Sequence, residues 1–341
     1  MTRSLCLLGL AAACLCTAFG AHAQELQLHG LLDLSAGRFH SPGAARDWRV
    51  ENGAMSPSFI AVRGSDGLGG GLKAVFAFGH FLRADTGQAG RFYGDAFWAR
   101  EAHVGLSGAF GTTVLGRSMT PLFVSTVRFS AFGDSFAFSP SVRQLFAPSL
   151  LPFFGDRAWN NAIAYSSNGA EGLSQHLIAS LGEGAGGKNF GAGVRYFRGP
   201  LGATVAWQRV RPGEGVPTTG PGAAPAGFTK QETWLFGASY DLTLFEMYGQ
   251  YTHVRTRAAV HSRTELWSVG TSMPLGAGKL LAQYGHARAS MAGVEPRNRT
   301  FSIGYDHHLS PRTDVYAVFM NDRVSPLGSG NSFAGGLRTR F

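Results

Sequence analysis

Polar and apolar side chains alternate in segments of about ten residues along much of the chain. The last segment, residues 332–341, has Phe333, Leu337 and Phe341 on one face and Arg338 and Arg340 on the other. Successive side chains of a β-strand point to opposite faces, so this strand needs an apolar surrounding on one side and water on the other. Residues 26–36, 72–83, 201–208, 233–241 and 245–252 alternate in the same way. Tilted strands of this length can cross a membrane.

The composition favours a membrane β-barrel over a soluble domain. Charged residues make up only 15% of the chain, against about 25% in typical soluble domains. There are 48 glycines, and aromatic residues reach 12%. A soluble, glycine-rich β-solenoid is the alternative, but the sequence has no fixed short repeat. We therefore expect an all-β fold, a 16-stranded antiparallel transmembrane β-barrel.

The N-terminal residues have the pattern of a secretory signal. Arg3 precedes a short apolar stretch, and Ala21, His22 and Ala23 fit a cleavage site. We expect residues 1–23 to be a signal peptide and residues 24–341 to form one barrel domain. The apolar stretch is too short to span a membrane with margin. All three cysteines (Cys6, Cys14 and Cys16) lie in it, so the exported chain would have no disulfide; lipid attachment at Cys14 is an alternative.

The connections between the alternating segments differ in length. Short turns, such as the one around Pro311, alternate with longer loops, as in barrels that have short turns on one side and long loops on the other. One connection, residues 118–157, is far longer than the rest and rich in phenylalanine. Long loops in compact proteins are usually functional. We expect this loop to fold into the barrel lumen and narrow it; a surface flap is the alternative.

Motifs of other functional classes are weak. Residues 182–188 match the spacing of a phosphate-binding loop, but Asn189 follows in place of Ser or Thr. His307 and His308 are adjacent, so on a strand they point opposite ways. There is no nucleophile-elbow or zinc-protease motif. We predict no catalytic, cofactor or metal site. The formal net charge of +9 is scattered over single basic residues, which argues against nucleic-acid binding and suits a pore whose arginines set the field that ions cross.

Several motifs together resemble the general porins of the Gram-negative outer membrane, particularly the β-proteobacterial type. They are VRGSDGLGGGLKAVF (residues 62–76), DTG (85–87), FWAREAHVGLSGAFGTTVLGR (97–117), NNAIAYSS (160–167) and the terminal GLRTRF. The resemblance implies a homotrimer of 16-stranded barrels whose third loop enters the pore. It also implies assembly by the β-barrel assembly machinery, a surrounding of outer-membrane lipid and lipopolysaccharide, and passive diffusion of small hydrophilic solutes and ions.

The resemblance implies roles for several charged residues. This chain differs from the family's usual pattern in two places. Phe59 stands where the family usually has an arginine, and the long loop lacks the family's acidic stretch, with Asp134 the nearest acid. Arg100 and Arg157 correspond to wall positions that face the loop. We expect the lumen and constriction to be lined by Arg100, Arg157, Lys73, Arg117, Arg128, Asp134 and Arg143. The long loop has three arginines (Arg128, Arg143 and Arg157) against two aspartates (Asp134 and Asp156), so we expect the pore to prefer anions weakly.

Two further predictions concern assembly. If Arg100 faces the lumen, Glu101 and His103 face outward and are expected to be buried at a subunit interface; the reverse orientation is the alternative. By family resemblance, Phe341 belongs to a signal that the insertion machinery reads.

Two other functions remain open for this fold. In a substrate-specific channel, Phe129, Phe132, Phe136 and Phe138 would form a track for sugars or aromatic acids. An outer-membrane enzyme would need a serine and a histidine side by side on the outer face, and the strands show no convincing pair.

Overall fold

The computed structural model describes residues 25–147, 150–184, 186–213, 215–220 and 222–341. The expected signal peptide, with the alternative lipid site Cys14, lies outside the described residues. The elements are β1 (Glu25–Phe39), β2 (Asp47–Asn52), β3 (Phe59–Gly69), β4 (Leu72–Arg83), β5 (Gln88–Ala89), β6 (Glu101–Gly108), β7 (Gly111–Met119), α1 (Pro121–Arg128), α2 (Pro140–Phe146), β8 (Ala158–Ser166), β9 (Leu173–Ser180), β10 (Asn189–Arg198), β11 (Leu201–Val210), β12 (Lys230–Asp241), β13 (Glu246–Arg257), β14 (Ser262–Leu275), β15 (Gly278–Met291), β16 (Arg297–His308), β17 (Thr313–Val324) and β18 (Gly328–Arg340).

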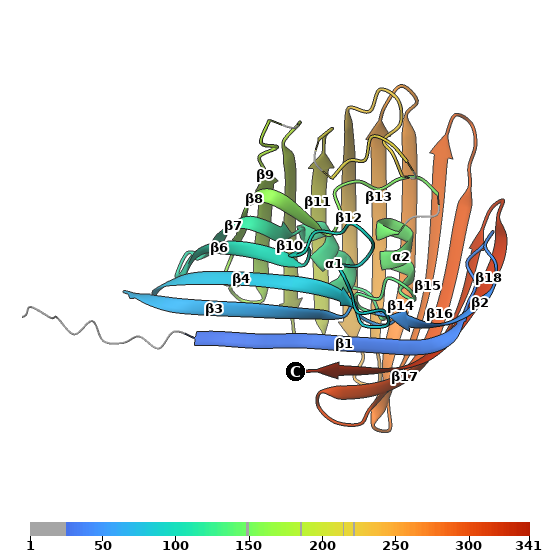
Figure 1. Ribbon diagram of the computed structural model, residues 1–341, viewed down its shortest axis with the longest axis horizontal. Helices are drawn as coiled ribbons and strands as arrows, with labels where there is room; N and C mark the ends of the chain where they lie inside the picture. Colours follow the sequence, from blue (N-terminus) through green and yellow to red (C-terminus); the bar gives the residue numbers. More distant parts are fainter. Residues whose placement is uncertain (1–24, 148–149, 185, 214, 221) are drawn as a thin grey trace, which may run out of the picture.

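All the strands belong to antiparallel pairs, and successive strands of the wall are neighbours (Figure 1). The sheet closes because β1 pairs with β18 on one side and with β3 on the other. β2 continues the pairing of β3 along β1, and β5 is a two-residue strand beside β4. Within the described residues, sixteen strands therefore form the wall of a closed barrel, which confirms the predicted fold.

The wall is apolar outside and polar inside. Large apolar side chains of alternate strand residues are exposed, as Leu28 (59%), Val104 (58%) and Leu115 (56%) show. Their polar neighbours point inward and are buried, Gln208 and Thr300 with no exposed surface at all. A soluble protein has the opposite distribution. The alternation in the sequence thus corresponds to one face toward lipid and one toward the lumen.

The last residue completes the seam of the barrel. The Phe341 N–H donates to the Gly30 carbonyl (3.1 Å), and the Gly30 N–H donates to the Phe341 carbonyl (3.0 Å). The Phe341 ring covers the outer face of Gly30, where a Cβ would lie 2.3 Å from the ring. Only glycine therefore leaves room for this ring on β1.

The long connection between β7 and β8 lies inside the barrel, with α1 and α2 among the strands in Figure 1. Each helix starts with a capping hydroxyl, Thr120 before α1 and Ser139 before α2, and with proline in its first turn. Within the described part of the chain, no helix is long and apolar enough to cross a membrane.

Inward side chains of the wall hold this connection in place. The Gln250 Nε2 donates to the carbonyls of Thr126 (2.9 Å) and Phe129, and the Gln231 Nε2 donates to the Pro152 carbonyl (3.1 Å). Further bonds join Ser125 to Thr204, Ser130 and Ser141 to Gln283, and Gln144 to Thr300. These contacts attach the loop to the inner side of the wall.

Deleting Phe341 should weaken the folded barrel, because it removes the two backbone hydrogen bonds at the seam. At about 0.5–1.5 kcal/mol for each bond, the loss is about 1–3 kcal/mol. The measurement is the temperature at which the folded band converts to the unfolded band in gel electrophoresis. Phe333→Ala, which removes an outward ring from β18 but keeps the seam, is the control. Equal midpoints for the deletion and the wild type would contradict this.

Replacing Gln250 by Met should loosen the loop. The substitution keeps the shape of the side chain but leaves two buried carbonyls without this donor, at a cost of about 1–3 kcal/mol for each unsatisfied group. We expect a lower unfolding midpoint and faster cleavage by trypsin after Arg128 or Arg143. Gln175→Met, on the outer face of β9, is the matched control. A variant that resists trypsin as well as the control does would show that Gln250 is not needed to hold the loop.

Candidate pore constriction

A recess of about 300 Å³ lies where the loop approaches the wall formed by β3, β4 and the start of β6. Its lining combines cations, one carboxylate and aromatic rings. The residues are Pro57, Phe59, Phe81, Arg100, Met119, Phe123, Val124, Val127, Arg128, Asp134 and Arg157. The structure thus brings together four of the residues predicted for the constriction: Arg100, Arg128, Asp134 and Arg157.

Arg157 is held between aromatic rings from the wall and the loop. Its guanidinium lies 4.3 Å from the centre of the Phe81 ring and 5.0 Å from that of Phe123. The side chain is buried, its Nε has no hydrogen-bond partner, and no described carboxylate forms an ion pair with it. Burial and the nearby Arg91 charge lower the pKa of Arg157 to about 9, so it stays protonated at neutral pH. A buried cation without an ion-pair partner favours an anion beside it.

Arg100 reaches from the barrel wall toward the loop. Its guanidinium lies 4.0 Å from the centre of the Phe59 ring. The family usually has an arginine at position 59; here the phenylalanine ring stabilises the Arg100 cation. The Arg100 chain passes over Gly79, where a Cβ would lie 3.2 Å from the Arg100 Cβ. Arg100 also forms an ion pair with Glu101.

The predicted outward orientation of Glu101 and His103 is wrong. The outward residues of β6 are Val104 and Leu106, which are exposed, and Glu101 and His103 have the opposite parity. Glu101 is buried and paired with both Arg100 and Arg63 (3.1 Å). His103 contacts the Arg117 carbonyl through Nδ1 (3.2 Å). Glu101 therefore compensates charge inside the barrel and does not face a neighbouring subunit.

A second ionic cluster, next to the first, was not predicted. Arg91 binds Asp95 (2.9 Å) and Asp156 (3.0 Å), and Arg117 binds Asp156 as well (3.2 Å). Burial alone would raise the pKa of Asp156, but hydrogen bonds and charge from Arg91 outweigh it and lower that pKa below its ordinary value. Asp156 is thus ionised and shared between two arginines. Arg91 lies outside any alternating segment, so no periodicity marks it.

The other predicted lumen residues lie apart from this recess. Arg143, on α2, forms an ion pair with Asp322 of β17 (3.2 Å) and so fixes the loop to that strand. Arg117 also donates to the Ala99 carbonyl (2.7 Å) and to the Asn160 side chain (2.6 Å). Lys73 is exposed near the tight turn between β3 and β4, at the short-turn mouth.

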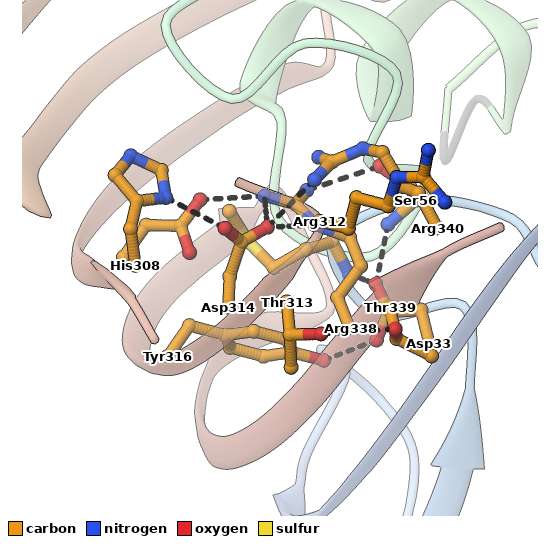
Figure 2. A network of polar contacts seen from close by, with 12 residues as sticks. Asp33, Ser56, His308, Arg312, Thr313, Asp314, Tyr316, Arg338, Thr339 and Arg340 are labelled. Carbon is orange, nitrogen blue, oxygen red and sulfur yellow. Dashed lines mark hydrogen bonds and ion pairs between the residues drawn. The ribbon is translucent and has the colours of Figure 1, made fainter. Parts of the chain in front are cut away.

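Asp134 is joined through Ser56 to a polar network on β1 and β16–β18. Figure 2 shows this network around Asp314 and Arg338. The Ser56 hydroxyl donates to the Asp134 carboxylate (2.9 Å), and the Arg338 guanidinium donates to the Ser56 hydroxyl (3.2 Å). Arg338 also binds Asp306 and Asp314, and Asp314 binds Arg340 and His308 as well. The Asp33 carboxylate accepts from the backbone N–H groups of Met55 and Ser56 and from the Tyr316 hydroxyl. The wall thereby fixes the loop carboxylate.

The predicted aromatic track is largely buried. Phe129 and Phe138 have no exposed surface, and Phe132 is 2% exposed, because all three pack between the loop and the wall. Phe136 alone of the four is partly exposed, beside a separate recess of about 440 Å³. The loop phenylalanines mainly anchor the loop.

Comparisons with known proteins agree with the observed fold. The family model described as Gram-negative porin matches residues 9–326. Outer membrane porin protein 32 of Delftia acidovorans is 28% identical, over 96% of this chain and 94% of that protein. Among solved structures, the anion-selective porin from Comamonas acidovorans has a TM-score of 0.77 at 22% identity, covering 93% of this chain and 100% of the other. A loop-deletion mutant of OmpT from Vibrio cholerae has a TM-score of 0.74 at 15% identity, covering 94% and 100%.

The match to the family model extends over almost the whole barrel, including the loop inside the lumen. The sequence predicted this relationship from separate motifs, and the comparison shows it for the chain as a unit. The closed barrel with a polar lumen and an inward loop has the architecture that such a channel needs. The chain therefore belongs to the Gram-negative porins and is an outer-membrane channel, not an enzyme.

Proposed function

We propose that this porin lets small hydrophilic solutes and ions diffuse passively and that it prefers anions. One observation carries the preference: among the described residues, no carboxylate pairs with Arg128 or Arg157 at the constriction. Glu101 is already shared by Arg63 and Arg100, and Asp156 by Arg91 and Arg117. The excess positive charge lies where the path is lined by the loop.

The location of these arginines makes the charge effective. At physiological ionic strength the screening length is about 8 Å, so charges at a narrow constriction act on a passing ion. The Phe81 and Phe123 rings beside Arg157 exclude water, which strengthens its field. On β16 and β17, Asp306 and Asp314 are compensated by Arg338. The relative from Comamonas acidovorans, described as anion-selective, supports the same sign.

Replacing Arg157 by Gln should reduce the anion preference. The measurement is the zero-current potential across a bilayer under a tenfold KCl gradient. The loss should be large in dilute salt and small at about 1 M, where the screening length is about 3 Å. Arg49→Gln is the control, since Arg49 is exposed and paired with Asp47 and Glu51. Cation preference in the wild type would contradict the proposal. An unchanged potential in Arg157→Gln would show that Arg157 does not contribute to the ion preference.

We further propose that the porin assembles as a homotrimer. The solved structures that match include a trimer form of OmpT from Vibrio cholerae. On this chain, an outward aromatic cluster beside β4 and β6 fits a subunit contact: Trp98 lies 4.9 Å from Phe78 and 4.8 Å from Phe97 between ring centres. Phe97 and Trp98 remain 58% and 42% exposed, leaving rings for a neighbour to cover. We also infer contacts with the assembly machinery, through Phe341, and with lipopolysaccharide.

A cysteine at Val104, on the outward face of β6, should cross-link subunits through a short bifunctional thiol reagent. The chain has no cysteine beyond residue 16, so the signal would come from the new site. Val269→Cys, similarly exposed on β14, is the control. Cross-linked species from Val104→Cys and monomers from the control are expected after denaturing electrophoresis. Monomers from both would place the interface elsewhere.

A further inference from the structure

The recess of about 440 Å³ beside Phe136 adjoins the constriction but does not contain its arginines. It lies between the connection inside the barrel and the hairpin that the end of β1 forms with β2. Pro57 and Phe81 line both this recess and the constriction recess, so the two spaces are neighbours. Its volume is within the range of small-molecule sites, about 300–1,000 Å³. We call it the aromatic recess.

Phenylalanine rings give the aromatic recess an apolar surface. Phe136 and Phe146 both pack on Phe123, with ring centres 6.2 and 5.1 Å from it, and both remain partly exposed. Phe92, from the connection between β4 and β6, lines the same recess and is 55% exposed. Because Phe136 and Phe146 are already packed on a neighbour, a flat apolar surface can lie on them at a small cost in side-chain entropy.

The charged side chains of the aromatic recess neutralise one another. Each arginine that lines it forms an ion pair with a carboxylate, and each carboxylate that lines it is paired as well. The pairs are Arg49–Glu51, Arg91–Asp156 and Arg143–Asp322. At the constriction, by contrast, Arg157 has no ion-pair partner among the described residues. The aromatic recess therefore has no excess charge to attract an ion, and an uncharged solute suits it better.

Polar atoms without partners remain beside the rings. Arg143 makes its side-chain hydrogen bonds through Nε and Nη2, Asn52 through Oδ1, and Glu51 through Oε2. In the part of the chain that the structure describes, the Nη1 of Arg143, the Nδ2 of Asn52 and the Oε1 of Glu51 have no hydrogen-bond partner. The aromatic recess thus offers both donors and an acceptor to a ligand.

We propose that the aromatic recess binds an uncharged sugar. The axial C–H groups of a pyranose form an apolar face, which can lie on the Phe136 and Phe146 rings. A hydroxyl group both donates and accepts, so the edge of the sugar ring matches the donors of Asn52 and Arg143 and the acceptor of Glu51. An aromatic carboxylate could cover the same rings, but its charge would have no unpaired cation to meet. The proposal rests on the proposed function and adds a class of solute to it.

The position of the aromatic recess gives the binding a role in diffusion. An uncharged solute gains nothing from the field of Arg157, so the charge of the constriction does not draw it in. A sugar that leaves the aromatic recess past Pro57 and Phe81 is already at the constriction recess. Conduction requires a site that is favourable enough to enter and weak enough to leave. A few rings and single hydrogen bonds meet this requirement.

The probe is cellobiose, whose glucose rings have apolar faces and equatorial hydroxyl groups. Added to the porin in a planar bilayer in symmetric KCl, it should reduce the ion current in a saturable way. Sorbitol, a linear polyol without a ring face, should lower the current only as the viscosity of the solution rises. Phe136→Leu keeps an apolar side chain but removes the ring, and it should raise the half-saturating concentration of cellobiose about fivefold.

Two further variants show whether the ring itself matters. Phe136→Tyr keeps the ring and should be blocked by cellobiose as the wild type is. Phe236→Leu is the matched control, because it removes a 47% exposed ring from the outward face of β12 and should leave the block unchanged. The gel shift on heating shows that each variant is folded before currents are compared. Equal half-saturating concentrations in the wild type and Phe136→Leu would overturn the proposal. So would a reduction of current by cellobiose that is no different from that by sorbitol.

Salt concentration distinguishes an uncharged ligand from an anionic one. The half-saturating concentration of cellobiose should be the same in about 0.1 M and about 1 M KCl, although the screening length falls from about 10 Å to about 3 Å. A saturable block by phenylacetate, with none by cellobiose, would make the recess a site for aromatic anions and the sugar proposal wrong. An open channel that cellobiose does not block would contradict the sugar site alone, whereas a folded porin that conducts no ions would contradict the proposed function.

Discussion

Closure of the backbone hydrogen-bond ladder is the requirement on which the rest of this structure depends. Lipid offers no partner to a peptide group, so a sheet in the membrane cannot have a free edge. In this chain, the first strand meets the last strand, and the final peptide group binds Gly30. Once the ring of strands is closed, strict alternation assigns every side chain to lipid or to water. The polar lumen, the inward loop and the ionic clusters all follow from that assignment.

Charge compensation inside the lumen is uneven, and the proposed anion preference of the channel depends on this unevenness. Carboxylates on the loop and on β6 are each shared by two arginines, while the arginines at the constriction recess keep excess charge. Aromatic rings flank those arginines, and they hold cations through their faces without neutralising them. A carboxylate in place of one of these rings would fix the guanidinium equally well but would cancel its field. The aromatic support therefore separates the positioning of a charge from its neutralisation.

The sequence was sufficient to predict the barrel, because its strands alternate cleanly and its composition suits lipid. It also predicted the loop inside the lumen from length and phenylalanine content. It failed at Glu101 because Arg100 precedes the strand and lies over Gly79, so two consecutive residues both reach the lumen. Side chains alternate between the two faces within a strand, but this alternation does not extend to the residue that precedes the strand. The pairing of Arg91 with Asp95 and Asp156 could not be predicted, since irregular segments have no period and their contacts depend on the folded loop.

The wall glutamines have a consequence for how such a channel can change over time. Gln250 and Gln231 bind carbonyl groups of the loop, and the Gln231 Oε1 also accepts from the Phe154 N–H. Every residue has a backbone carbonyl, whatever its side chain. These hydrogen bonds can therefore form whichever side chains the loop has. Side chains at the tip that do not anchor it can vary while the loop keeps its place. Descendants of one ancestral pore can thus diverge in the solutes they admit without first losing a foldable barrel.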